Sequence, residues 1–240
     1  MVFIITLITL VGLALFFFIK RRNFEKVWDW KEWEKPTSFY SLNEGNQTDL
    51  LLFAEVSSEW LDTVNENFPW EKFEIYDNRF GEYMSILFDE VVWKSGIKDE
   101  RELWTKLNYH QKIFGVFLAS DGDIDNGGVD QFIFNRPEFM VVVIDLWRLL
   151  EMENLITDYL DVLKEFSKKW PDFEDVVTQF GITPSGKGVK FPTLFPWDGS
   201  LKSSEKIEEY YYEEEFKKEL YQKISDFIEK NFDKFTKIIE

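Results

Sequence analysis

Carboxylates alternate with small residues in one stretch of this chain, residues 121–135, which invites comparison with metal-binding loops. Three aspartates stand at positions one, three and five of the EF-hand calcium pattern: Asp121, Asp123 and Asp125. Position six of that pattern should be glycine, but it is Asn126 here. Position twelve should be a bidentate glutamate, and it is Phe132. We therefore predict no metal ion and no other cofactor at this stretch.

The glycines of the same stretch allow two further interpretations. A phosphate-binding loop is disfavoured, because the neighbouring carboxylates would repel an anion and no lysine follows the glycines. In the structural interpretation, which we favour, the Asn-Gly-Gly sequence permits positive backbone dihedrals or a close approach of another segment. Asp125 or Asn126 would then cap a helix, and Gln131 and Asn135, four residues apart, would share one face of it.

This stretch resembles the central motif of a domain family of unknown function, the DNA mimic protein nineteen-like family. Six residues match its Asn-Gly-Gly, its Gln-aromatic pair and its final Asn: Asn126, Gly127, Gly128, Gln131, Phe132 and Asn135. The resemblance covers about residues 80–181 and implies a mostly helical fold. The chain departs from the pattern at Val129, where an aromatic residue is common, and at Arg136 and Pro137, where small residues usually follow. In the best-known member, acidic side chains occupy the DNA-binding face of a transcription factor, which depends on surface charge layout rather than on the motif.

The charge balance restricts the possible partners. The chain has 45 acidic and 28 basic residues and a net charge of -17, so it should repel nucleic acids, and direct nucleic-acid binding is disfavoured. A basic protein is the partner that we expect. The candidate acidic binding surface comprises two groups of carboxylates: Asp121, Asp123, Asp125 and Asp130, and Glu208, Glu209, Glu213, Glu214 and Glu215. The second group flanks three tyrosines, so it also fits a solvated helix face with the tyrosines packed on the core.

A catalytic set is not evident in the sequence. There is no cysteine, His110 is the one histidine, and neither a Gly-x-Ser-x-Gly nor a His-Glu-x-x-His pattern occurs. We therefore expect a non-enzymatic interaction module that binds a basic protein, in one version by imitating nucleic-acid charge. Two alternatives stay open. One is a divalent-metal-dependent enzyme that uses the carboxylates from Asp121 to Asp130, and the other is an immunity-type protein that neutralises a toxin.

The N-terminal segment predicts a membrane anchor. Residues 1–19 contain no charged side chain, and a helix of that length reaches about 28 Å, close to the hydrocarbon thickness of a bilayer. The basic cluster Lys20, Arg21 and Arg22 follows directly, and such clusters normally stay on the cytoplasmic side. We predict a single-pass anchor at 1–19, a juxtamembrane segment and linker at 20–48, and a cytoplasmic domain at 49–240.

The fold class expected for that domain is mainly α, a compact multi-helix soluble domain behind one N-terminal transmembrane helix. Apolar residues recur at i, i+3 and i+4 in most of the chain, and 25 Phe and 10 Trp supply material for a large core. Helices are predicted at 50–67, 80–93, 99–120, 136–150, 155–170 and 173–180, and a long loop at 183–204. Residues 205–240, expected as an extension beyond the family-like core, should close the fold with one or two helices.

Overall fold

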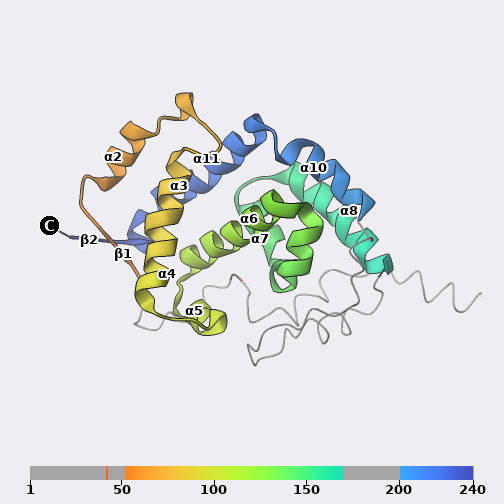
Figure 1. Ribbon diagram of the computed structural model, residues 1–240, viewed down its shortest axis with the longest axis horizontal. Coiled ribbons are helices and arrows are strands. Elements are labelled where there is room, and N and C mark those ends of the chain that lie inside the picture. Colours follow the sequence, from red (N-terminus) through yellow and green to blue (C-terminus); the bar gives the residue numbers. More distant parts are fainter. Residues whose placement is uncertain (1–41, 43–51, 170–200, 240) are drawn as a thin grey trace, which may run out of the picture.

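The computed structural model describes residues 42, 52–169 and 201–239. The predicted anchor at 1–19, nearly all of the segment 20–48, the predicted helix at 173–180 and most of the predicted loop 183–204 lie outside this part of the chain. Among the described residues, no helix combines the length and the apolar character needed to cross a bilayer. The described part is mainly helical, as predicted (Figure 1).

The domain begins with a short strand, which corrects the helix predicted at 50–67. β1 (Ala54–Val56) precedes α2 (Trp60–Asn67), so only the second half of the predicted helix is helical. In β1 the side chains of Ala54 and Val56 are buried and Glu55 points outward. This two-residue period over three positions is too short to stand out against the helical spacing of the same residues. β1 pairs in parallel with β2 (Thr236–Ile238), so the two ends of the described domain meet.

A continuous helical rod follows α2 and confirms the helix predicted at 80–93. It consists of α3 (Arg79–Met84), a π-helical turn at Ser85–Asp89 and α4 (Glu90–Ser95). The Asn78 side chain caps its start by accepting a hydrogen bond from the Phe80 N–H at 3.0 Å. Gly96 ends the rod with a left-handed φ of 67°, as the sequence predicted.

The helix predicted at 99–120 is instead two helices, α5 (Glu100–Lys106) and α6 (Tyr109–Asn135). A capping box separates them. The Asn108 side chain accepts from the Gln111 N–H, and the Gln111 side chain accepts from the Asn108 N–H, both at 3.0 Å. These reciprocal bonds satisfy N–H groups that a helix start leaves unpaired. The apolar periodicity continues across the break, and for this reason the prediction missed it.

The chain then returns along α6. A 3₁₀ turn at Pro137–Phe139 leads into α7 (Val142–Leu149), which occupies the second half of the predicted helix 136–150, and α8 (Glu153–Lys169) follows almost as predicted. After the undescribed segment come α10 (Glu205–Tyr211) and α11 (Glu214–Lys230), the two closing helices that were expected, and then β2. In Figure 1, α10 and α8 lie at one end of the domain, and α2 and the two strands lie at the other.

Aromatic side chains hold these helices together around α6. The Phe80 ring of α3 stacks on Tyr221 of α11, with a centroid distance of 4.5 Å, and meets Phe117 of α6 edge-on at 5.2 Å. Trp147 of α7 meets Tyr159 of α8 edge-on at 4.9 Å. Aromatic pairs of this kind contribute about 0.5–1.5 kcal/mol beyond the area that they bury. The high aromatic content therefore belongs largely to the core.

Candidate functional site

The Asn-Gly-Gly sequence forms a kink inside α6 rather than a loop. Gly127 has an extended φ of -166°, and Gly128 has φ 83° and ψ 179°, a combination that side-chain-bearing residues rarely adopt. Helix precedes and follows these two residues. A Cβ atom at Gly128 would overlap the carboxylate of Glu208 from α10. Gly128 therefore provides both the positive dihedral and the close approach that the structural interpretation predicted.

The other motif residues stabilise the kink. The Gln131 side chain folds back over Gly127, where a Cβ atom would overlap its Oε1. Asn135 Nδ2 donates a hydrogen bond to Asp123 Oδ1 at 2.8 Å and so links the two halves of α6. Phe132 is fully buried in the core. In the described structure, the motif residues therefore stabilise the bend in α6.

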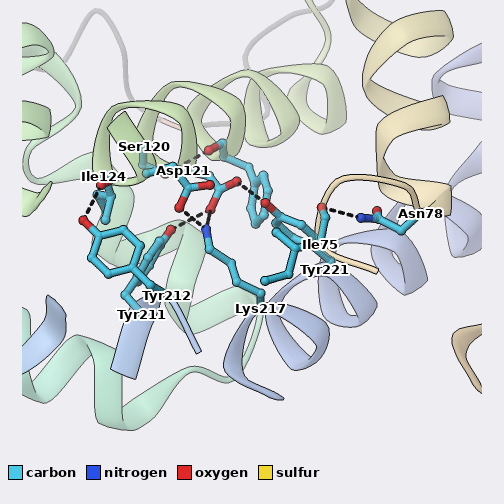
Figure 2. Close-up of polar contacts among 11 residues, drawn as sticks. Ile75, Asn78, Ser120, Asp121, Ile124, Tyr211, Tyr212, Lys217 and Tyr221 are labelled. Carbon is cyan, nitrogen blue, oxygen red and sulfur yellow. Dashed lines mark hydrogen bonds and ion pairs between the residues drawn. The ribbon is translucent and has the colours of Figure 1, made fainter. Parts of the chain in front are cut away.

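A buried polar cluster lies on the N-terminal side of this kink (Figure 2). Asp121 of α6 is buried and accepts three hydrogen bonds from the closing helices. Tyr211 Oη and Lys217 Nζ donate to its Oδ1 at 2.8 and 2.7 Å, and Tyr221 Oη donates to its Oδ2 at 2.9 Å. Because one carboxylate bonds both α10 and α11, this cluster fixes the closing helices onto α6.

Lys217 is the cation at the centre of the cluster. Its side chain is 2% exposed, and its Nζ lies 2.5 Å from Asp125 Oδ1 as well as against Asp121. The Nζ also lies 4.2 Å from the ring centroid of Tyr211 and 5.3 Å from that of Tyr221, within the range of a cation–π interaction. Burial and the nearby Asp121 raise the pKa of both tyrosine hydroxyls, so these hydroxyls stay protonated donors. Burial, together with Asp121, also raises the pKa of Asp125.

The four aspartates predicted as part of an acidic surface do not form one, which corrects that prediction. Asp121 is buried, and Asp125 faces Lys217 instead of capping a helix. Asp123 binds Asn135, and Asp130 accepts a hydrogen bond from the Leu201 N–H at 2.9 Å. Asp121 and Asp125 thus share Lys217, while Asp123 and Asp130 bind elsewhere. Within the described ranges, no group of three or more His, Asp or Glu side chains is arranged to hold a metal ion.

The predicted glutamates behave differently. Glu208 is half-buried against Gly128, but the other four are exposed, and so is Glu205, which was not part of the predicted surface. We call these five residues the acidic segment: Glu205, Glu209, Glu213, Glu214 and Glu215. No member of the acidic segment forms an ion pair with another described residue. Of the flanking tyrosines, Tyr211 is buried, as the interpretation of tyrosines packed on the core predicted, while Tyr212 is 44% exposed.

Two lysines near the acidic segment are paired with other helices. Lys206 Nζ lies 2.6 Å from Asp158 Oδ1 of α8, and Lys217 is buried against α6. The direct ion pairs of both lysines are therefore made with aspartates, although Lys206 is also attracted by Glu209 at longer range. The carboxylates of the acidic segment outnumber the nearby cations and make no direct ion pair with a described residue, an arrangement that favours contact with a basic surface.

Sequence reasoning expected the tyrosines of residues 210–212 to pack on the core but missed three other residues that organise this region: Asp158, Lys217 and Tyr221. Lys217 and Asp121 are 96 residues apart, and a lysine in a charged helix usually faces solvent. One signal was present: Lys217 lies three residues before the buried Leu220, and Tyr221 lies four residues after Lys217 and three before the buried Ile224, so both fall on the buried face of the helix.

A family model described as DMP19-like protein matches residues 105–231, just over half of the chain. The match takes in α6 with its kink, α10 and α11, and so it includes residues 205–231, which were expected as an extension beyond the family-like core at 80–181. No curated protein and no solved structure matches the chain.

Proposed function

Because the chain belongs to the DMP19-like protein family, we propose that it is an acidic interaction protein whose acidic segment binds a basic, nucleic-acid-binding protein. In this proposal the carboxylates occupy the positions that phosphates would take on the partner. The observation that carries it is the exposure of the five glutamates, none of which makes a direct ion pair with a described residue, beside two lysines whose ion pairs are with aspartates of other helices.

Two features of the described structure support a binding role for this region. Glu213, Glu214 and Glu215 lie at the N-terminal end of α11, so the helix dipole stabilises their crowded negative charge. Asp121 of α6 bonds Tyr211 of α10 and Lys217 and Tyr221 of α11, so the carboxylates are presented on a fixed backbone. Prearranged charge reduces the ordering cost of association and speeds encounter with an oppositely charged partner.

The proposal includes a location. The uncharged segment 1–19 and the basic residues that follow it support a single-pass anchor with the domain on the cytoplasmic side. A tether would keep the acidic segment near the membrane and raise the effective concentration for a partner that is also held there.

The test is affinity capture with the full chain in a neutral detergent, from a lysate of its own source, at low and at high salt. Three baits are compared. They are the unchanged chain, a variant with Glu213→Gln, Glu214→Gln and Glu215→Gln, and a matched variant with Glu59→Gln, Asp62→Asn and Glu66→Gln. The control residues are likewise exposed. Glu59 is the N-cap residue of α2 and the other two lie in α2, at the other end of the domain.

We expect the unchanged and α2 baits to retain a basic nucleic-acid-binding protein at low salt and to lose it at high salt, because exposed charges are screened. The α11 bait should retain much less of it. Equal recovery on all three baits, or recovery that does not respond to salt, would refute a binding role for the acidic segment.

A further inference from the structure

A pocket of about 230 Å³ lies between the start of α8 and the helices α10 and α11, next to the acidic segment. Small-molecule sites typically measure about 300–1,000 Å³, so this space is smaller than a usual cofactor site. Apolar side chains form part of its wall: Met152, Leu155 and Phe216. The pocket therefore suits a single side chain with an apolar stem.

The remaining wall is anionic. Glu151, Glu153 and Glu219 line the pocket, and they come from three places in the fold: the turn after α7, the first turn of α8, and α11. One internal cation is close, since Lys223 Nζ lies 3.6 Å from Glu219 Oε1 and donates to the Glu151 carbonyl at 3.3 Å. Three carboxylates against one ammonium leave a net negative pocket.

An aromatic wall completes the pocket. The Phe216 ring packs on Tyr210 with a centroid distance of 4.9 Å, and both rings line the space. Tyr210 Oη donates to Asp158 Oδ2 at 3.2 Å, which fixes the orientation of its ring. A planar cation can stack on such rings, and arginine does so more often than lysine.

We propose that this pocket receives one arginine side chain of the basic partner. The methylene stem lies along Phe216 and Leu155, and the guanidinium lies among Glu153, Glu219 and the Tyr210 ring. Arginine fits because its fork can bond two carboxylates while its plane stacks on a ring. This inference rests on the proposed function. It adds one arginine of the partner as an anchor residue, inserted into the pocket beside the acidic segment. Anchors of this type carry much of the binding energy of an interface.

The experiment measures binding of a defined probe to the full chain in detergent, by isothermal titration calorimetry. The probe is an acetylated and amidated peptide of alternating arginine and glycine. Two further peptides replace arginine with citrulline, which keeps the shape without the charge, or with lysine. Glu153→Gln with Glu219→Gln removes two pocket carboxylates, and Glu59→Gln with Glu66→Gln is the matched control at α2.

We expect the pocket variant to weaken binding of the arginine peptide about tenfold, and the control to change it less than twofold. Asn154 also lines the pocket, so Asn154→Arg should block it while leaving every carboxylate in place. Its control, Asn67→Arg, adds the same charge at the exposed end of α2. Lysine should bind more weakly than arginine, and citrulline should not bind.

The outcomes separate this inference from the proposed function. Weaker binding in the Glu213–Glu215 variant, with no effect of the pocket variant or of Asn154→Arg, would overturn the pocket and leave the acidic segment in place. An equal loss of affinity in Asn154→Arg and Asn67→Arg would show that the effect comes from net charge alone, and would also overturn the proposed arginine site. Equal affinity for arginine and lysine peptides would remove the argument for a stacked guanidinium.

Discussion

Replacing the buried lysine, Lys217→Met, tests whether the Asp121 cluster fastens the closing helices to α6. Methionine keeps most of the apolar stem of the lysine but removes the ammonium that lies 2.7 Å from Asp121 Oδ1 and 2.5 Å from Asp125 Oδ1. Asp121 stays buried, with 8% of its side chain exposed, and loses its counter-charge. Asp125 is partly exposed, so water can solvate its charge when the ammonium is removed.

The magnitude follows from these exposures. Removing one partner of a buried ion pair typically costs about 3–5 kcal/mol, because the remaining charge is uncompensated. Asp121 keeps two hydrogen bonds from Tyr211 and Tyr221, so we expect the lower end, about 3 kcal/mol. Since whole domains are stable by only about 5–15 kcal/mol, this loss would be a large part of the total.

Urea unfolding of the full chain in detergent, followed by tryptophan fluorescence, measures the change in the free energy of unfolding. The matched control is Lys218→Met, one residue further along α11, where the half-buried lysine forms no ion pair with a described residue, and we expect a change within about 0.5 kcal/mol. Adding Asp121→Asn to Lys217→Met removes both charges and should recover part of the loss. If Lys217→Met lowers the free energy of unfolding by no more than about 1 kcal/mol beyond the control, the Asp121 cluster does not hold the closing helices on α6.

Three further changes test other parts of the fold. Gly128→Ala should destabilise the domain by about 1–3 kcal/mol, while Gly122→Ala, in open helical surroundings, should stabilise it by up to about 1 kcal/mol; thermal unfolding compares the two. Burial raises the pKa of Glu138 from 4.5 to about 7, so the folded state holds this proton more tightly and stability falls as pH rises through that interval. Glu138→Gln should therefore increase the free energy of unfolding, measured by urea unfolding, by about 1–3 kcal/mol at about pH 8 and change it little at about pH 4. Glu151 has a left-handed φ of 54°, so Glu151→Gly should leave the melting temperature unchanged or higher, and a clear decrease would show that its side chain is needed for stability.

Local patterns were enough to predict the elements whose signals lie within one helix. The start and end of α8 and the stop at Gly96 follow from apolar spacing and from a glycine that tolerates a left-handed dihedral. The Asn-Gly-Gly motif likewise indicated a special backbone, and Gly128 has one. The boundary at Asn108 was missed because a capping box of two polar residues is a weaker signal than a continuing apolar stripe.

The arrangement of the carboxylates could not be predicted in the same way. Asp121, Asp123, Asp125 and Asp130 are close in sequence, but on a bent helix they turn toward partners on α11, on α6 itself and at Leu201. A run of aspartates in a sequence suggests a solvated surface or a metal-binding loop. The contact of Asp121 and Asp125 with the buried Lys217 gives these carboxylates a structural role instead. That lysine lies on a helix almost a hundred residues later, and no local rule connects the two.

The buried lysine also bears on the surface. Residues 205–219 contain seven glutamates and three lysines, so composition alone suggests partial neutralisation. In the fold, Lys206 and Lys217 pair with Asp158 and Asp121 on other helices, which leaves one lysine of the three for the glutamates. Exposed carboxylates that repel one another favour separation of the helices that carry them. The same two lysines whose ion pairs are made with aspartates anchor α10 and α11 to α8 and α6, so the contacts that reduce the neutralisation of the acidic segment also hold it in place.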